Sequence, residues 1–246
     1  MKAELRSYPA DLHLHTILSP CGDEHMIPEL IFAAALQKGL RVLAITDHNS
    51  TRNLPAFLKN RPPELWVIPG MEVQTKEEIH LVCLFPSLEP AMAWGEMVRR
   101  LLPSVGNDQG YFGNQIILDE TGEPVGEEER LLLNSINLSL TETVTRVRSL
   151  GGIIYPAHID RPAFSITSQI GFLPPEPVFK VLEISPRSVL EKIKPQYAGY
   201  VLIRSSDAHY LNQIGIKTST LKMADLQWEE LLLAFNHREK REAIPN

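Results

Sequence analysis

Histidines and carboxylates two positions apart occur near both ends of this 246-residue chain. The stretch DLHLHT holds His13 and His15, and the stretch SSDAH holds Asp207 and His209. Side chains at positions i and i+2 of an extended segment point to the same face, so each pair presents two donor groups together. Imidazole and carboxylate groups in combination suit Zn, Mn or Fe ions. The two pairs therefore predict a transition-metal site.

Other histidines and acids follow further apolar runs of the chain. Asp47 and Glu72 each follow such a run, and six of the eight histidines lie at the ends or edges of predicted strands. These six are His13, His15, His48, His80, His158 and His209. A buried histidine needs a hydrogen-bond partner, so this gathering favours a shared metal centre. The alternatives are a ring of structural hydrogen bonds or a single structural ion.

Short apolar strands that alternate with helical segments are predicted to position these residues. Helices are expected over 27–39, 50–60, 88–102 and 139–152. Strands are expected over 10–15, 41–46, 65–73, 79–85, 151–156, 180–185 and 200–206. This alternation predicts parallel βα units in a barrel or partly closed barrel. The strand ends of one barrel face converge, which brings distant residues to one site.

Local signals mark the ends of two expected helices. Ser139 followed by Glu142 fits a capping box at the start of one helix. Pro28 suits the first turn of another, and Gly39 suits its C-terminal cap. These signals predict both helices independently of the apolar pattern.

The region 103–138 departs from this alternation and is rich in polar residues and glycine. Within it, QIILDETGEPVG predicts a small hairpin. We expect this region to be an insertion over one face of a single domain spanning residues 1–246.

Composition limits the classes of protein to consider. The formal net charge of −6 gives no general attraction to phosphate backbones, although a local basic patch stays open. Cys21 and Cys83 are too isolated to suggest a zinc knuckle or a disulfide framework. The polar start and the lack of a long apolar run predict no secretion signal and no membrane span. We therefore expect a cytoplasmic protein.

The ordered set of motifs resembles the PHP family (polymerase and histidinol phosphatase). The matching stretches cover about residues 10–210 and are DLHLHT, the following Asp23, TDHN, GMEV, the isolated His80, PAHID and SSDAH. The resemblance implies a distorted seven-stranded (β/α)7 barrel. It also implies up to three divalent transition-metal ions (Zn, Mn or Fe) and the hydrolysis of phosphoesters.

The resemblance further implies a set of nine metal ligands. One ion would be held by His13, His15, Glu72 and Asp207. Glu72 would bridge to a second ion completed by His80 and His158, and a third would be held by Asp23, His48 and His209. All nine positions carry competent ligand types. The complete set favours a catalytic protein over a metal-binding module.

Several residues beside the ligands have expected roles. Arg161 lies three positions after His158 and is placed to grip a phosphate bidentately. Arg187 is a second, weaker phosphate-binding candidate, and Arg204 could equally be structural. Asp47 is expected to orient His48, since ligating histidines usually donate their other N–H to such a group. Cys21 is expected to be a packed thiol.

The chemistry expected of this set is metal-assisted phosphoester hydrolysis. Glu72 would fix the spacing of the ions. Asp207 or His209 would deprotonate water or protonate the leaving alcohol, and Arg161 would bind the phosphate.

The expected substrate is a small phosphorylated metabolite or nucleotide. One alternative is a nuclease that uses the same site on DNA or RNA. Another is a non-enzymatic metal-binding regulatory module. The sequence leaves the substrate, the metal at each position, the role of the insertion and the oligomeric state open.

Overall fold

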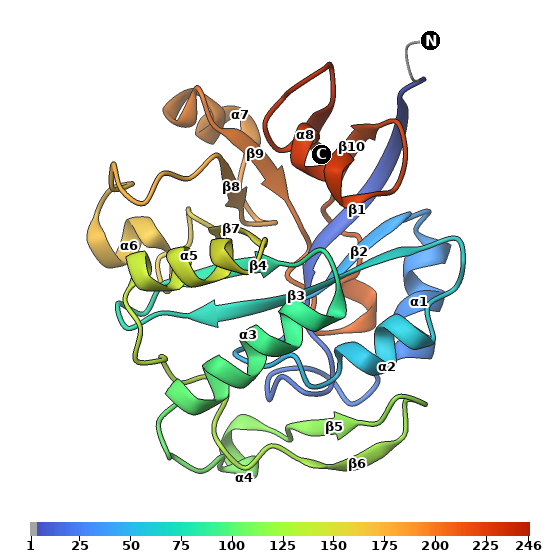
Figure 1. Cartoon of the computed structure of the whole chain (residues 1–246), viewed down its shortest axis with the longest axis vertical. Coiled ribbons are helices and arrows are strands. Elements are labelled where there is room, and N and C mark those ends of the chain that lie inside the picture. The colour runs from blue at the N-terminus through green and yellow to red at the C-terminus, as the bar shows by residue number, and fades with distance from the viewer. Residues whose placement is uncertain (1–3) are drawn as a thin grey trace.

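A computed structural model describes residues 4–246, in which one large sheet is flanked by helices (Figure 1). Seven strands form this sheet in the order β11-β10-β1-β2-β3-β4-β7. Their bounds are β1 (Arg6–Leu14), β2 (Val42–Ile45), β3 (Trp66–Gln74), β4 (His80–Leu84), β7 (Ile153–Pro156), β10 (Ser219–Met223) and β11 (Glu242–Pro245).

Two smaller sheets lie beside the large one. Strands β8 (Val181–Ile184) and β9 (Val201–Arg204) pair in parallel as a sheet of their own. Strands β5 (Ile116–Leu118) and β6 (Pro124–Glu127) form an antiparallel hairpin. The hairpin lies within the region 103–138, where the sequence predicted one.

The large sheet is an open, curled half-barrel, so the closed (β/α)7 barrel expected from the sequence is not what forms. All seven expected strands are present, but β8 and β9 form a separate sheet, while β10 and β11 join the large one. Only β1–β2 and β2–β3 pair in parallel within it. Residues 75–79 join β3 to β4, and five residues suit a hairpin but not the crossover that a parallel pair needs.

Helices cover the sheet and connect its strands. The longer ones are α1 (Pro28–Gln37), α2 (Leu54–Lys59), α3 (Leu88–Leu101), α5 (Leu140–Ser149) and α8 (Trp228–Ala234). The short ones are α4 (Gln109–Phe112), α6 (Ile166–Ile170), α7 (Leu190–Ile193), and the 3-10 turns η1 (Lys194–Tyr197) and η2 (Leu211–Gln213). The capping box of Ser139 and Glu142 is confirmed at the start of α5. Gly39 follows α1 with a φ of 73°, as a C-terminal cap requires.

Apolar side chains fill both sides of the large sheet. Phe57 and Trp94 belong to the buried cluster shared with α2 and α3, and both are fully buried. Tyr155 and Phe235 belong to a second buried cluster, to which α8 contributes. The sheet is thus the middle layer of the core, and the polar ends of its strands are left for the site.

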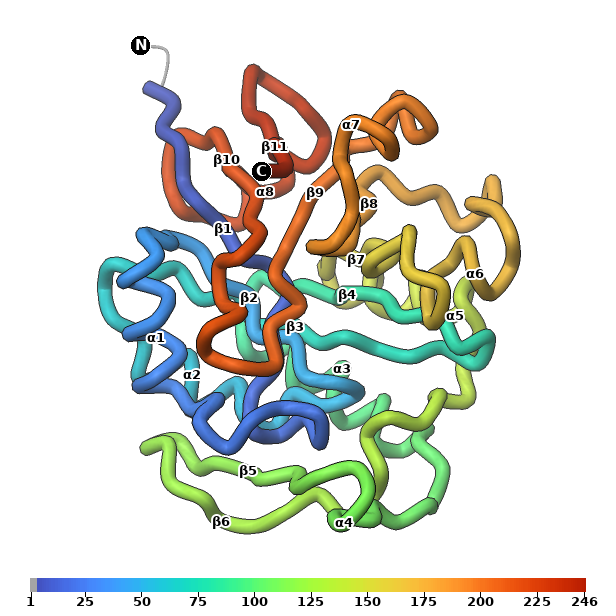
Figure 2. The backbone as a smooth tube through the Cα atoms, turned by 180° about the vertical axis from the view of Figure 1, so that it is seen from behind, coloured from blue at the N-terminus to red at the C-terminus, as the bar shows by residue number. Residues whose placement is uncertain are grey.

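The insertion lies against the loop that follows β1. The Asn53 side chain bonds Ile116 O and Leu118 N, which ties β5 to the start of α2. At Gly113, whose φ is 100°, a Cβ atom would come within 2.1 Å of the carbonyl oxygen of Pro20. Only glycine permits this approach. Figures 1 and 2 place the insertion at the opposite end of the molecule from the C-terminus.

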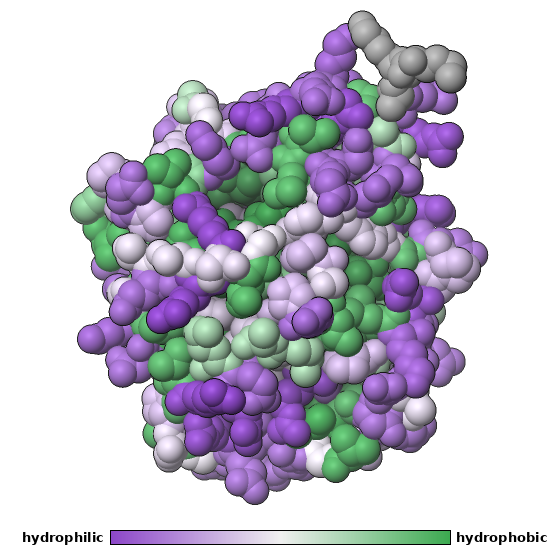
Figure 3. All heavy atoms as spheres, viewed as in Figure 1, coloured by the Kyte–Doolittle hydropathy of each residue, from purple (hydrophilic) through white to green (hydrophobic). Residues whose placement is uncertain are grey.

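The surface over α3 and α5 mixes polar and apolar residues (Figure 3). Scattered exposed apolar side chains of this kind are normal for a folded domain. Within residues 4–246, no helix combines the length and apolar character needed to cross a membrane.

Candidate metal centre

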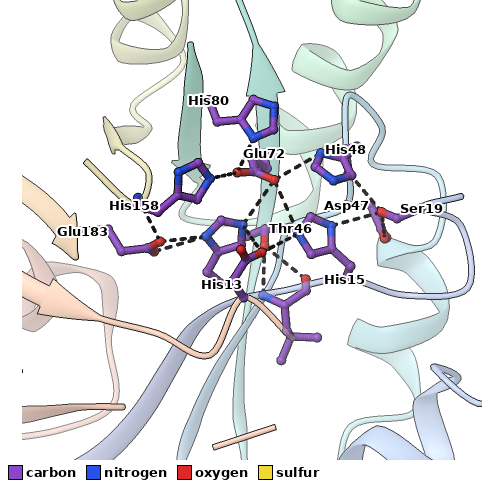
Figure 4. Close-up of polar contacts among 12 residues, drawn as sticks. His13, His15, Ser19, Thr46, Asp47, His48, Glu72, His80, His158 and Glu183 are labelled. Carbon is purple, nitrogen blue, oxygen red and sulfur yellow. Dashed lines mark hydrogen bonds and ion pairs between the residues drawn. The ribbon is translucent and has the colours of Figure 1, made fainter. Parts of the chain in front are cut away.

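The carboxylate of Glu72 lies at the centre of the histidine cluster (Figure 4). Its Oε1 atom lies 2.9 Å from His80 Nδ1 and 3.1 Å from His158 Nε2. Its Oε2 atom lies 3.3 Å from His13 Nε2, 3.4 Å from His15 Nε2 and 3.1 Å from His48 Nδ1. The two oxygens therefore face two different groups of imidazoles.

Asp207 closes one of these groups from the other side. Its Oδ1 atom lies 3.5 Å from His13 Nε2 and 3.3 Å from His15 Nε2. Backbone hydrogen bonds fix this approach, because Asp207 N donates to His13 O and His15 N donates to Ala208 O. The end of β1 and the loop after β9 are thereby joined, although nearly 200 positions separate them.

Three groups of side chains are close enough to hold an ion. They are His13, His15, Glu72 and Asp207; His48, Glu72 and His80; and His15, His48 and His209. His158 contacts Glu72 directly but lies outside these groups. Asp23 is also outside them, since its carboxylate accepts hydrogen bonds from His25 Nδ1 and His25 N. The backbone N–H of Asp23 donates to His209 O, which keeps the residue beside the cluster.

The donor atoms fit divalent transition metals. Ligand atoms about 2.1 Å from one ion, at tetrahedral or octahedral angles, lie about 3.0–3.4 Å from each other. The distances of 3.3–3.5 Å from His13 and His15 to the two carboxylates lie close to the upper end of this spacing. Both Nε2 atoms are buried without a hydrogen-bond partner, which is costly in a protein interior. A cation among these atoms would satisfy them.

Side chains behind the cluster fix the orientation of two imidazoles. His13 Nδ1 donates to Glu183, at 3.0 Å from Oε1 and 3.2 Å from Oε2. His15 Nδ1 lies 3.1 Å from the hydroxyl of Ser19, which itself donates to Asp47. With Nδ1 as the donor in each ring, the Nε2 atoms point into the cluster.

Glu183 and Ser19 were not identified from the sequence. Glu183 stands alone in the apolar run KVLEIS and is 1% exposed. A charged residue within a buried strand needs a partner, and this was the available signal. Ser19 gave no comparable signal in its loop.

Asp47 contacts a different partner from the one expected. Its carboxylate accepts hydrogen bonds from Thr16 N, Thr16 Oγ1 and Ser19 Oγ. It therefore orients His15 through Ser19, in place of the expected bond to its neighbour His48. The backbone N–H of His48 also donates to Ser19 Oγ.

The two central carboxylates are held in the ionised form. Burial opposes ionisation of Glu72, but the imidazoles of His80 and His13 outweigh it and hold its pKa well below the usual value. Burial likewise opposes ionisation of Asp207, and His13 and His15 keep its pKa below the usual range. Both carboxylates are thus available as anionic ligands near neutral pH.

The imidazoles divide into charged and neutral rings. Burial opposes charging of His13, but Glu183 and Glu72 raise its pKa well above the usual value. Burial, together with His209, lowers the pKa of His15 to about 4. Burial and the neighbouring His15 lower the pKa of His48 well below its usual value. His15 and His48 therefore carry free lone pairs at neutral pH, whereas His13 must release a proton before it can bind a cation.

Backbone strain gathers around the cluster. Asn49, His158 and Asp207 have φ angles of 47°, 29° and 51°. Non-glycine residues rarely adopt this left-handed region, and such strain concentrates at functional sites. The fold therefore stabilises an unfavourable backbone in order to aim these residues.

The predicted arginines lie in three different settings. Arg161 is 44% exposed at its side chain, and its Nη1 atom lies 2.8 Å from Asp207 Oδ2. Arg187 lies exposed in the turn after β8. Arg204 is buried and donates to the carbonyls of Pro186, Ser188 and Asn246, so its role is structural.

Cys21 is a packed thiol, as expected. Burial raises the pKa of Cys21 to about 12, with a further contribution from Glu72. The thiol therefore stays protonated near neutral pH.

Comparison with known families matches the PHP domain over residues 11–215 of this chain. The chain belongs to the PHP domain family. The family resemblance predicted from the ordered motifs is thereby confirmed, and the His, Glu and Asp cluster lies within the matched region.

Curated relatives of this PHP chain match parts of it. The 5'-3' exoribonuclease Rnm of Salmonella typhimurium is 38% identical over 80 residues, covering 30% of this chain and 26% of that protein. An uncharacterized protein of Methanocaldococcus jannaschii is 25% identical over 162 residues, covering 66% of this chain and 18% of that protein. This chain thus corresponds to a small part of each relative.

Solved structures share the fold of this PHP chain. The lesion-specific endonuclease Q of Pyrococcus furiosus aligns with a TM-score of 0.72 and 19% identity, over 97% of this chain and 58% of that one. A structure of endonuclease Q with a 27-mer duplex, whose abasic lesion is at the active site, aligns with a TM-score of 0.73. A predicted PHP-like phosphoesterase of Bacteroides vulgatus aligns with a TM-score of 0.55 and 14% identity, over 99% of this chain and 66% of that one.

Proposed function

We propose that this chain hydrolyses phosphoesters with up to three divalent transition-metal ions (Zn, Mn or Fe). The supporting observation is that the two oxygens of the Glu72 carboxylate face separate groups of imidazoles. A carboxylate in this position suits the bridge between two ions. Membership of the PHP family supports the same chemistry.

The proposed ligands follow the family resemblance, and the structure brings most of them close together. His13, His15, Glu72 and Asp207 would hold one ion. Glu72, His80 and His158 would hold a second, with His48 close to the same carboxylate. His48 and His209 would hold a third, and Asp23 would join them by giving up its contact with His25. Bound ions would lower the pKa of water to roughly 7 and offset the charge that grows on the phosphate.

The chain's own residues would orient the substrate and move protons. Glu72 would fix the separation of the two groups of imidazoles. His209 has a side chain 21% exposed and Asp207 one 12% exposed, so both reach the mouth of the site. We assign proton transfer to and from the attacking water and the leaving alcohol to these two residues.

Arg161 is the proposed phosphate-binding residue at the same mouth. One of its N–H groups donates to Asp207, and the remaining N–H groups are free to bind the non-bridging oxygens of a phosphate. Arg187 lies in an exposed turn. Its role as a phosphate contact stays a prediction.

We propose a phosphodiester in RNA or DNA as the substrate class. Support comes from the exoribonuclease relative and from the fold shared with a DNA endonuclease. The alternative substrate is a small phosphorylated metabolite or nucleotide, which the net charge of −6 favours.

A substrate panel with two site variants tests the function. Short RNA and DNA strands and phosphorylated metabolites would be incubated with Mn, Zn or Fe separately. We expect phosphate or nucleotide release with at least one substrate, loss of release in His13→Ala and Asp207→Asn, and retention in His237→Asn, a histidine on the surface. No release under any condition, or equal release by His13→Ala, would refute the proposal.

Salt dependence separates the two substrate classes. A strand that contacts the protein through several phosphates loses affinity steeply with salt, with a log–log slope of about −0.7 per contact. A single phosphate group gives a slope near that of one contact. A steep slope would therefore support the strand, and a shallow slope the metabolite.

A further inference from the structure

A compact loop at the mouth of the site, residues 158–165, carries three side chains to three parts of the cluster. His158 reaches Glu72, and Arg161 reaches Asp207. The loop is closed by hydrogen bonds from Arg161 N to His158 O and from Ser165 Oγ to Arg161 O. The backbone that carries these side chains is therefore tied into a compact turn.

Phe164 is the third of these side chains and is an unusual surface aromatic. Its ring stacks on the imidazole of His80, with centroids 4.9 Å apart and an interplanar angle of 15°. Its carbonyl accepts a hydrogen bond from His80 N at 2.9 Å. The residue is nevertheless 38% exposed and has a φ of 59°. A bulky residue in this left-handed conformation is a true outlier, and the fold maintains it beside a candidate ligand.

We propose that Phe164 is a stacking surface for the base of the nucleotide next to the scissile phosphate, an inference that rests on the function proposed above. Aromatic rings stack with bases of any sequence because every base has a π face. Arg161 lies three residues away on the same loop, so one nucleotide would meet the guanidinium with its phosphate and the ring with its base. A base already paired within a duplex cannot stack here. The preferred substrate is therefore an unpaired nucleotide at a single-stranded segment or end.

A pair of substrates isolates the stacking contribution. One is a short single strand with a normal base beside the scissile phosphate, and the other has an abasic sugar at that position. The variant Phe164→Leu removes the ring, and Phe164→Tyr retains it. Phe172→Leu is the matched control, since Phe172 is 61% exposed and lies outside the loop.

We expect Phe164→Leu to raise KM for the base-bearing strand about fivefold to a hundredfold and to leave its kcat nearly unchanged. The abasic strand should be hydrolysed equally by Phe164→Leu and by the unchanged protein. Phe164→Tyr and Phe172→Leu should retain the original KM on both strands. Equal losses on both strands would overturn the proposal, because Phe164 would then serve only to hold His80.

A binding measurement keeps this inference separate from the proposed function. A strand with 2-aminopurine at the same position loses fluorescence when that base stacks. We expect quenching by the Asp207→Asn protein and its loss in the double variant with Phe164→Leu. If the Asp207→Asn protein quenches the fluorescence but the unchanged protein hydrolyses no strand, the proposed function is refuted and the stacking surface is still supported. Equal quenching by both variants would refute the stacking surface.

Discussion

Glu183 is not one of the proposed ligands, but it contacts two of them on the side away from Glu72. Its carboxylate accepts hydrogen bonds from His13 Nδ1 and from the backbone N–H of His158. It thus positions one proposed ligand from each side of Glu72. A charged partner of this kind fixes the tautomer of an imidazole and raises its basicity as a ligand.

The substitution Glu183→Gln should weaken metal binding about 10- to 100-fold while the fold is retained. The amide oxygen still accepts a hydrogen bond from His13, but the negative charge is lost. The measurement is a competition titration with a metal-binding dye. Glu64→Gln serves as the control, because Glu64 is exposed. Unchanged affinity in Glu183→Gln would show that Glu183 does not tune the site.

The orientation of a side chain could be predicted from the sequence where local backbone geometry determines it. The shared face of His13 and His15 follows from strand periodicity alone, and both rings do point at Glu72. The partner of Asp47 could not be predicted in this way. Asp47 lies beside His48 in sequence, yet a loop folds Ser19 and Thr16 onto its carboxylate. Tertiary contacts of this kind have no periodic signal.

At the scale of elements, one buried side chain of the insertion joins the two ends of its hairpin. Gln115 is fully buried and donates to the carbonyls of Glu128 and Arg130, while its own oxygen accepts from Leu132 N. These bonds tie the two ends of the β5–β6 hairpin together.

Replacing this side chain with an apolar one should destabilise the protein. Gln115→Leu leaves three backbone groups without their partners, which should lower the free energy of unfolding by about 2–4 kcal/mol. Urea denaturation followed by circular dichroism measures the loss. Gln169→Leu is the matched control in the exposed part of α6, with an expected change within about 0.5 kcal/mol. Similar midpoints for the two variants would contradict the role assigned to Gln115.

The positions of the strands were easier to predict than their pairing. Each expected strand is present, because a short apolar run is a local property of the sequence. The pairing depends on connections, and the antiparallel β3–β4 pair makes closure by parallel units impossible. The five-residue link 75–79 between these strands was the available signal for a hairpin. The general alternation of strands and helices concealed it.

At the scale of the whole molecule, the proposed site joins two separate sheets. His13 and Glu72 come from the large sheet, whereas Asp207 follows β9 in the small parallel sheet. Strands β7 and β8 are neighbours but belong to different sheets. Figures 1 and 2 show β8 and β9 together beside the large sheet. Ions bound between these side chains would hold the two sheets against each other.

Removing the metal should therefore lower the melting temperature. Occupation of one site at about a hundred times its Kd contributes about 2.7 kcal/mol, which corresponds to about 5–10 °C in a domain of this size. Calorimetry with and without a chelator measures the shift. Hydrogen exchange should also accelerate more in β8 and β9 than in β2 and β3.

The control for metal removal is the His13→Ala protein, in which the chelator should cause a smaller shift. An equal shift in both proteins would mean that the chelator acts elsewhere. Uniform acceleration of exchange over all strands would contradict a bond between the two sheets.

The boundary between β7 and β8, where the two sheets meet, has a consequence for the amount of this protein in the cell. If ions hold the β8–β9 sheet against the large sheet, the protein becomes easier to degrade when those ions are scarce, since proteases cut the loosened form. Nutrient metal would then govern its lifetime together with its turnover of substrate. Starvation for the ion would clear the idle polypeptide, and resupply would have to be followed by new synthesis.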